Sequence, residues 1–202
     1  MKRIFDIVLS IIFLIILLLP MLLIALLVRF TSNGQALYWS NRVGKNGVLF
    51  KMPKFRSMQV YTPAVATHLM KRPDEFLLPI GAFLRRSSLD ELPQLFSILK
   101  GDMSFVGPRP ALFNQDDLIA LRIEKDVDQL VPGITGWAQV NGRNAITWGE
   151  KFDLDVWYVD NQSIWLDIKI LWLTVKKVIM RDGINQVGQS TMENFKGNDN
   201  EK

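Results

Sequence analysis

The chain has 202 residues, of which 49% are hydrophobic, and a formal net charge of +4. This length suits one domain plus a membrane element, and the charge favours anionic partners such as phospholipid headgroups or nucleotides. The absence of cysteine and the single histidine exclude disulfides, thiol nucleophiles, cysteine-ligated zinc and multi-histidine metal sites. Any metal should therefore be a hard cation held by oxygen atoms. The basic residues are dispersed and match no nucleic-acid motif, so no nucleic-acid partner is expected.

The first thirty residues predict association with a membrane. The run from Ile7 to Val28 is apolar except for Ser10 and Pro20. A helix of this length covers about 33 Å, the thickness of a hydrocarbon core. A straight span is the default on length alone, whereas a kink at Pro20 would suit a re-entrant hairpin.

Charged residues flank this apolar run at both ends. Lys2 and Arg3 precede it, and one of them is expected to pair with Asp6, which is costly at an apolar edge. The basic residues that follow it are Arg29, Arg42, Lys45, Lys51 and Lys54. Because basic residues stay on the cytoplasmic side, both ends fit if the helix bends and returns. From these patterns alone, the straight span remains slightly favoured.

Residues 36–58 predict a β-hairpin followed by a basic strand. Short apolar runs at 36–39 and 48–52 flank a loop with Asn-Gly turn chemistry. Further along, alternation would place Lys54 and Arg56 on one face of a strand, where they would meet either solvent or an anionic substrate.

Two adjacent carboxylates, Asp90 and Glu91, follow a short predicted helix that ends in Arg85 and Arg86. One interpretation is structural, since Ser88 and Glu91 have the spacing of a helix capping box. This motif alone favours capping. The other interpretation is catalytic: one carboxylate attacks phosphorus while its neighbour binds a charge-neutralising metal. Adjacent side chains on a helix point about 100° apart, which would allow this division of roles.

Two later arginines have surroundings that suit phosphate recognition. Arg109 lies between two prolines, so it is either a fixed guanidinium for a phosphate or a surface turn. Residues 131–144 are glycine-rich, which allows backbone to approach a ligand closely, and they place Arg143 after a tight turn. Neither a Walker loop nor a dinucleotide-binding fingerprint is present.

The C-terminal half predicts two helices and a tail. Residues 111–130 are charged and predict a solvent-facing helix. Residues 163–181 combine helical periodicity with a basic polar face, which fits either the headgroup region of a membrane or burial against a core. The polar residues 189–202 are predicted to be disordered.

Taken in order, these motifs resemble those of the bacterial sugar transferases, the monotopic phosphoglycosyl transferases, in their minimal PglC-like form. The matching pieces cover nearly all of residues 1–185. Besides the Pro20-interrupted helix they are Lys2–Asp6, Lys54–Met58, Leu84–Leu95, Val106–Pro110, Pro132–Arg143 and Leu154–Tyr158.

This resemblance implies an α+β, mostly helical protein at the cytoplasmic face of the bacterial inner membrane. Residues 1–30 would form a re-entrant membrane helix with a break, in place of the straight span. Residues 31–188 would form a small cytosolic catalytic domain with interfacial amphipathic helices. Members often carry Ser-Pro at the break, whereas this chain has Leu19-Pro20 and lacks that hydroxyl.

The resemblance also implies the reaction. The enzyme would move a sugar 1-phosphate from a UDP-sugar to undecaprenyl phosphate and release UMP, the first membrane step in making an O-antigen, capsule or glycoprotein glycan. Asp90 would be the nucleophile that forms a phosphosugar–aspartyl intermediate, and Glu91 would bind Mg²⁺. The segment 62–69 is similar to members that use N-acetylated sugars. The expected substrate-binding residues are Arg56, Arg85, Arg86, Arg109 and Arg143.

Two alternatives remain open. A non-catalytic membrane adaptor would use the Asp90–Glu91 pair only as a helix cap. A metal-dependent phosphodiesterase would release the sugar phosphate to water without a lipid acceptor. Oligomeric state cannot be deduced from these patterns.

Overall fold

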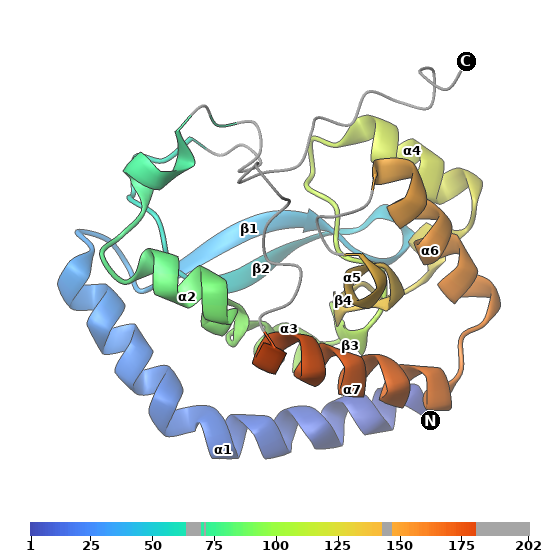
Figure 1. Ribbon diagram of the computed structural model, residues 1–202, viewed down its shortest axis with the longest axis horizontal. Helices are drawn as coiled ribbons and strands as arrows, with labels where there is room; N and C mark the ends of the chain where they lie inside the picture. The colour runs from blue at the N-terminus through green and yellow to red at the C-terminus, as the bar shows by residue number, and fades with distance from the viewer. Residues whose placement is uncertain (64–69, 71, 143–146, 181–202) are drawn as a thin grey trace. The chain divides into compact units, whose positions relative to one another are not determined.

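The computed structural model describes residues 1–63, 70, 72–142 and 147–180 (Figure 1). Predictions for most of segment 62–69, for Arg143 and for the tail at 189–202 fall outside these residues. The chain divides into two compact units. The first comprises residues 1–41 and 51–101, and the second comprises residues 42–50 and everything from residue 102 onward.

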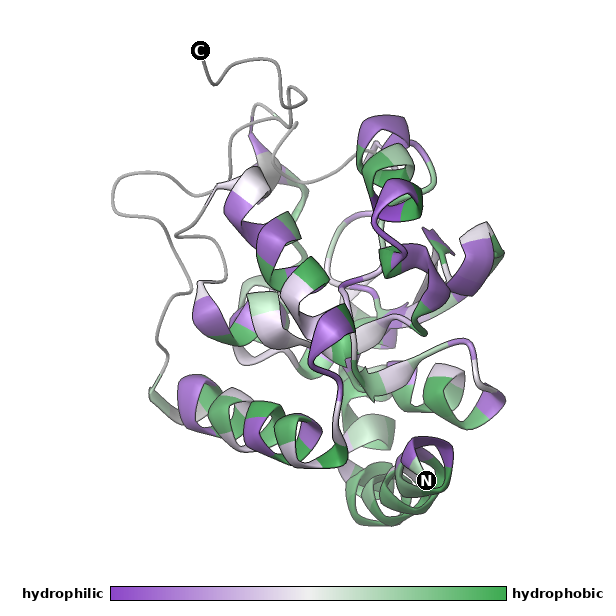
Figure 2. Ribbon diagram, turned by 90° about the vertical axis from the view of Figure 1, so that its right-hand side faces the viewer, coloured by the Kyte–Doolittle hydropathy of each residue, from purple (hydrophilic) through white to green (hydrophobic). Residues whose placement is uncertain are grey.

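A long apolar helix, α1 (Lys2–Thr31), dominates the first unit. It contains Pro20, and Figure 1 shows it bending about halfway along its length. Within the described residues, it is the one helix long and apolar enough to cross a membrane. Its buried residues recur at helical spacing and so form one face: Asp6, Ser10, Met21, Ile24 and Val28. Figure 2 shows that this helix is mostly apolar apart from the residues close to its N-terminus.

Both halves of α1 pack against the first unit. In its second half, Met21, Ile24 and Val28 join a hydrophobic cluster with Phe55 and Leu84. Near its start, the Arg3 guanidinium donates hydrogen bonds to the backbone carbonyls of residues 98 and 99. One face of α1 is therefore a protein contact, and most of its remaining apolar side chains are exposed.

The rest of the first unit consists of short elements. The strands β1 (Leu37–Val43) and β2 (Leu49–Phe55) pair with each other as a hairpin, and only their residues outside 42–50 belong to this unit. The helices α2 (Gly81–Ser87) and α3 (Gln94–Lys100) flank a 3₁₀ turn at Leu89–Glu91. The structure confirms the predicted hairpin and short helix.

The described part of the second unit contains a parallel strand pair and four α-helices. Strands β3 (Ser104–Val106) and β4 (Gly133–Thr135) pair with Ser104 opposite Gly133 and Val106 opposite Thr135. The helices are α4 (Asp116–Glu124), α5 (Trp137–Asn141), α6 (Trp148–Asp160) and α7 (Ile164–Met180). The predicted helix at 163–181 is confirmed as α7, and the described part of the chain is mostly helical, as expected.

Helix α7 is fixed to this unit by polar contacts on its inner face. The Tyr158 hydroxyl donates to the buried carboxylate of Asp167, and the Thr174 and Thr135 hydroxyls lie 2.7 Å apart. Ile170 on the same side is fully buried. These contacts anchor α7 to α6 and β4.

One prediction for the second unit is wrong. The region 111–130 is not one solvent-facing helix, because α4 covers only nine residues and buries Leu118 in a cluster with Val127 and Phe152. The glycine-rich region 131–144 supplies β4 and α5. Its glycines serve packing: a Cβ on Gly133 would lie 2.2 Å from the Gly107 nitrogen, so the strands approach too closely for a side chain.

Candidate active site

The Asp90–Glu91 pair lies on a tight turn between two short helices. Helix α2 ends at Ser87, and Ser88 adopts a left-handed conformation with φ of 58°. Such a backbone conformation is uncommon outside glycine and recurs at functional sites. The carboxylates then follow on the 3₁₀ turn before Pro93 and α3.

The predicted capping box at this turn is wrong. The Ser88 side chain caps no helix, and the turn it precedes is 3₁₀. Ser88 cannot act as an ordinary N-cap because its left-handed backbone departs from the extended conformation that this position requires. A capping box does form at the start of α6. It joins Thr147 and Glu150, a pair that was not among the sequence-based predictions.

Glu91 instead binds a lysine from the hairpin. The Lys54 Nζ atom lies 2.6 Å from Glu91 Oε1, and the two side chains are only 15% and 18% exposed. A charge-assisted hydrogen bond of this length holds the Glu91 carboxylate in place. Asp90, its neighbour, is buried with 9% exposure. The site thus contains two carboxylates and a cation, all largely removed from water.

The arginines of the first unit have different surroundings. Arg85 and Arg86 are exposed in the last turn of α2, and Arg85 donates to Met58 Sδ over 3.1 Å. Arg56 donates to the carbonyl of Gln35 over 2.8 Å and lies above the ring of Tyr38. These contacts show that Arg56 holds the segment before β1 in place. This structural role is an alternative to its predicted role in substrate binding.

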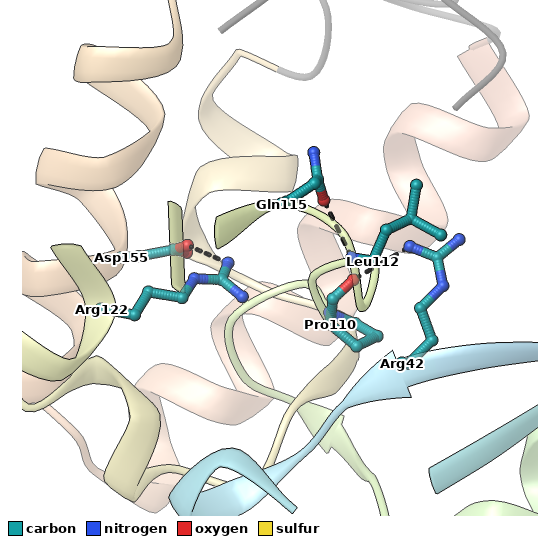
Figure 3. A network of polar contacts seen from close by, with 6 residues as sticks. All are labelled: Arg42, Pro110, Leu112, Gln115, Arg122 and Asp155. Atoms are coloured by element: carbon teal, nitrogen blue, oxygen red, sulfur yellow. Dashed lines mark hydrogen bonds and ion pairs between the residues drawn. The ribbon is translucent and has the colours of Figure 1, made fainter. Parts of the chain in front are cut away.

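In the second unit, Arg109 is presented by a firmly held loop. It is exposed, whereas the prolines on either side of it are buried. The Arg42 guanidinium donates to the carbonyl of Pro110 over 3.2 Å, and Gln115 accepts a hydrogen bond from the Leu112 backbone (Figure 3). These hydrogen bonds support the loop around Arg109, and both its rigidity and the binding of a phosphate remain predictions.

Near Arg109 lies Lys151, a lysine whose pKa is lowered. Burial, aided by the nearby positive charge of Arg109, lowers the pKa of Lys151 to about 8. On the same helix, burial raises the pKa of Asp155, and its ion pair with Arg122, at 3.1 Å, opposes that rise (Figure 3). Arg109 and Lys151 therefore form a locally cationic region on the second unit.

The residues at the turn fit a metal that is shared with a substrate. No group of three or more acidic or histidine side chains that could hold a metal occurs among the described residues. Mg²⁺ typically takes one or two carboxylates and completes its coordination with water and substrate phosphates. Glu91 suits this role, because its carboxylate already binds one cation, the ammonium of Lys54.

Sequence reasoning missed two features near the turn. The pairing of Lys54 with Glu91 spans 37 residues, so no local pattern announces it. Gln94 is 2% exposed, and its side-chain nitrogen has no hydrogen-bond partner. A polar residue at the start of an apolar helical stripe was the available signal for Gln94.

Comparison with known proteins identifies the family. The model of the family described as "Bacterial sugar transferase" matches residues 1–181, so the chain belongs to the bacterial sugar transferases. It is 44% identical to "Uncharacterized sugar transferase EpsL" of Bacillus subtilis (strain 168), over 98% of this chain and 96% of that protein.

Two relatives with more specific names are longer. The chain is 42% identical to "Undecaprenyl-phosphate galactose phosphotransferase" of Salmonella typhimurium, over 91% of this chain and 41% of that protein. It is 38% identical to "UDP-glucose:undecaprenyl-phosphate glucose-1-phosphate transferase" of Escherichia coli (strain K12), over 88% of this chain and 40% of that protein. The chain therefore spans less than half the length of these two relatives.

Proposed function

We propose that the protein transfers a sugar 1-phosphate from a UDP-sugar to undecaprenyl phosphate and releases UMP. The observation that carries this proposal is the pair of buried Asp90 and partly buried Glu91 on a strained turn beside Lys54. The names of the Salmonella and E. coli relatives supply the lipid acceptor and the class of reaction. The product would begin a glycan on its lipid carrier.

The proposed reaction has two displacement steps at one phosphorus atom. An Asp90 oxygen attacks the β-phosphorus of the UDP-sugar, and the bond from that phosphorus to the oxygen of UMP breaks. A phosphate oxygen of undecaprenyl phosphate then attacks the same phosphorus and releases Asp90 as a carboxylate. Mg²⁺ held by Glu91 would neutralise charge on the diphosphate when bound. Exposed arginines of α2 would attract the same anionic substrate.

The membrane part of the proposal rests on α1 and α7. The outer face of α7 exposes Trp165 by 79% and Trp172 by 62%, and Lys176 Nζ lies 5.5 Å from the Trp172 ring centroid. Tryptophan and lysine together favour the headgroup region of a membrane. We therefore assign α7 to the interface with the bilayer and the catalytic residues to the cytoplasmic side of the bacterial inner membrane.

The sugar is the least determined part of the substrate. The relatives with specific names carry glucose or galactose in those names. The N-acetylated sugar indicated by the sequence rests on a segment that lies largely outside the described residues. Glucose and galactose donors therefore belong in the first experiment beside the N-acetylated ones.

The decisive measurement is UMP release by the detergent-solubilised full chain from a panel of UDP-sugars, with and without Mg²⁺ and undecaprenyl phosphate. We expect release that requires both additions with one donor. The Asp90→Asn variant should lose on the order of a thousandfold in turnover, because it removes the nucleophile. Full turnover by that variant would refute the mechanism. Metal-dependent release of sugar phosphate without the lipid would indicate a phosphodiesterase, and no release from folded protein would favour an adaptor.

A further inference from the structure

A short ion pair at the candidate nucleophile's turn joins Lys54 and Glu91. Their charged atoms lie 2.6 Å apart, and neither side chain is more than 18% exposed. Because so little water reaches the pair, the attraction between the two charges is only weakly screened. The lysine comes from the end of β2, so the hairpin delivers a cation to the carboxylate assigned to the metal.

The same carboxylate cannot satisfy Lys54 and a divalent metal at once without cost. An ammonium and a doubly charged ion at one carboxylate repel each other strongly in a partly buried site. The described residues offer no third acidic or histidine side chain to form a metal cage. The protein alone should therefore bind a divalent metal weakly, and a diphosphate would have to supply most of the remaining ligands.

We propose that Lys54 is the resident counter-ion of Glu91 in the free enzyme and yields this carboxylate to the metal that arrives with the diphosphate. The ammonium released from Glu91 is then available to a phosphate oxygen. Lys54 thus keeps Glu91 oriented before the substrate binds and makes metal binding conditional on the nucleotide. The inference rests on the proposed function, in which Glu91 is the metal ligand.

The test measures metal binding rather than turnover. Mn²⁺ serves as the probe, and its free concentration is followed by electron paramagnetic resonance with the detergent-solubilised full chain and no nucleotide. Lys54→Met should bind Mn²⁺ about tenfold more tightly than the unchanged protein, because a competing unit charge has been removed. Lys54→Arg retains the charge and should bind Mn²⁺ as weakly as the unchanged protein does.

A matched control is available on the same strand. Lys51 is exposed on β2, so Lys51→Met changes the net charge equally but leaves Glu91 untouched, and it should not alter Mn²⁺ affinity. Adding Glu91→Gln to Lys54→Met should abolish the gain. Thermal unfolding would verify that each variant folds, and Lys54→Gln would replace any Lys54→Met protein that does not.

Two results would overturn the inference. One is an unchanged or weaker Mn²⁺ affinity in folded Lys54→Met, which would make Lys54 only a structural support of Glu91. The other is the absence of Mn²⁺ binding in every variant, even with UDP added. The proposed transfer is judged separately, because lipid-dependent UMP release and its loss in Asp90→Asn do not depend on Lys54.

Discussion

Two ion pairs with low exposure differ in what surrounds them. Lys54–Glu91 lies beside the proposed nucleophile, whereas Arg122–Asp155 joins α4 to α6 within the second unit. The Arg122 Nε atom is buried and has no hydrogen-bond partner, so this guanidinium is not fully satisfied. Unsatisfied buried groups cost stability, and such a cost is commonly retained where geometry serves function.

At the scale of single residues, Lys151 predicts how the stability of the fold changes with pH. Burial and Arg109 depress its pKa to about 8, so the folded protein binds its proton less readily than the unfolded chain does. Between pH 8 and the unfolded value of 10.5, the unfolded state holds more protons, and this residue's contribution to stability rises with pH. Below pH 8 the charged lysine destabilises the fold.

Replacing Lys151 with methionine should therefore stabilise the protein at neutral pH. Because the side chain is half-buried and partly screened, we expect about 1 kcal/mol, or roughly 2–4 °C in Tm. Thermal unfolding at pH 7 and pH 10.5 would measure the difference, which should shrink at the higher pH. A difference that stays constant with pH would attribute the effect to packing instead of charge.

At the scale of elements, Arg3 couples the start of α1 to the end of α3. Its guanidinium donates to the carbonyls of Ile98 and Leu99, which lie in the last turn of α3. A cation at this position donates to carbonyls at the end of the helix and complements the helix dipole. Helix α3 follows the carboxylate turn after only two residues, so a loose α3 would also loosen Glu91.

Removing this contact should destabilise the first unit. Arg3→Met removes the charged donor to both carbonyls, of which only that of Ile98 also accepts from the Gly101 backbone N–H, and we expect a loss of about 1–3 kcal/mol in unfolding free energy. Arg3→Lys keeps the charge but cannot donate to both carbonyls from one planar group. Its unfolding free energy should therefore lie between those of the unchanged protein and Arg3→Met. Urea unfolding of the three proteins in detergent would rank them. Equal stability would mean that Arg3 serves only to orient the chain in the membrane.

For the whole molecule, the sequence predicted the elements whose signals are local. A long apolar run located α1, helical periodicity located α7, and turn chemistry located the hairpin. The failures depended on distant partners: β4 forms because Gly133 meets the backbone of Gly107, and Lys54 finds Glu91 from another element. The capping box predicted at Ser88 is wrong, because its spacing to Glu91 fits such a box while its left-handed backbone prevents one.

The course of α1 decides how the molecule meets the bilayer. Arg3 near its start and Val28 near its end both contact the first unit, and the buried polar side chains of Asp6 and Ser10 lie on the inner face. A straight span would carry one end away from that unit to the opposite side of the membrane. Contacts at both ends favour a helix that enters and leaves on one side.

Cysteine accessibility would measure this directly, because the natural chain contains no cysteine. Ile4 and Asn33 are exposed near the two ends of α1, so Ile4→Cys and Asn33→Cys report each end separately. In intact spheroplasts, a membrane-impermeant maleimide should label neither variant, and permeabilisation should expose both. Labelling of Ile4→Cys alone before permeabilisation would establish a straight span. In that case Arg3 would lie across the bilayer from α3, and the contact that stabilises the carboxylate turn could not exist.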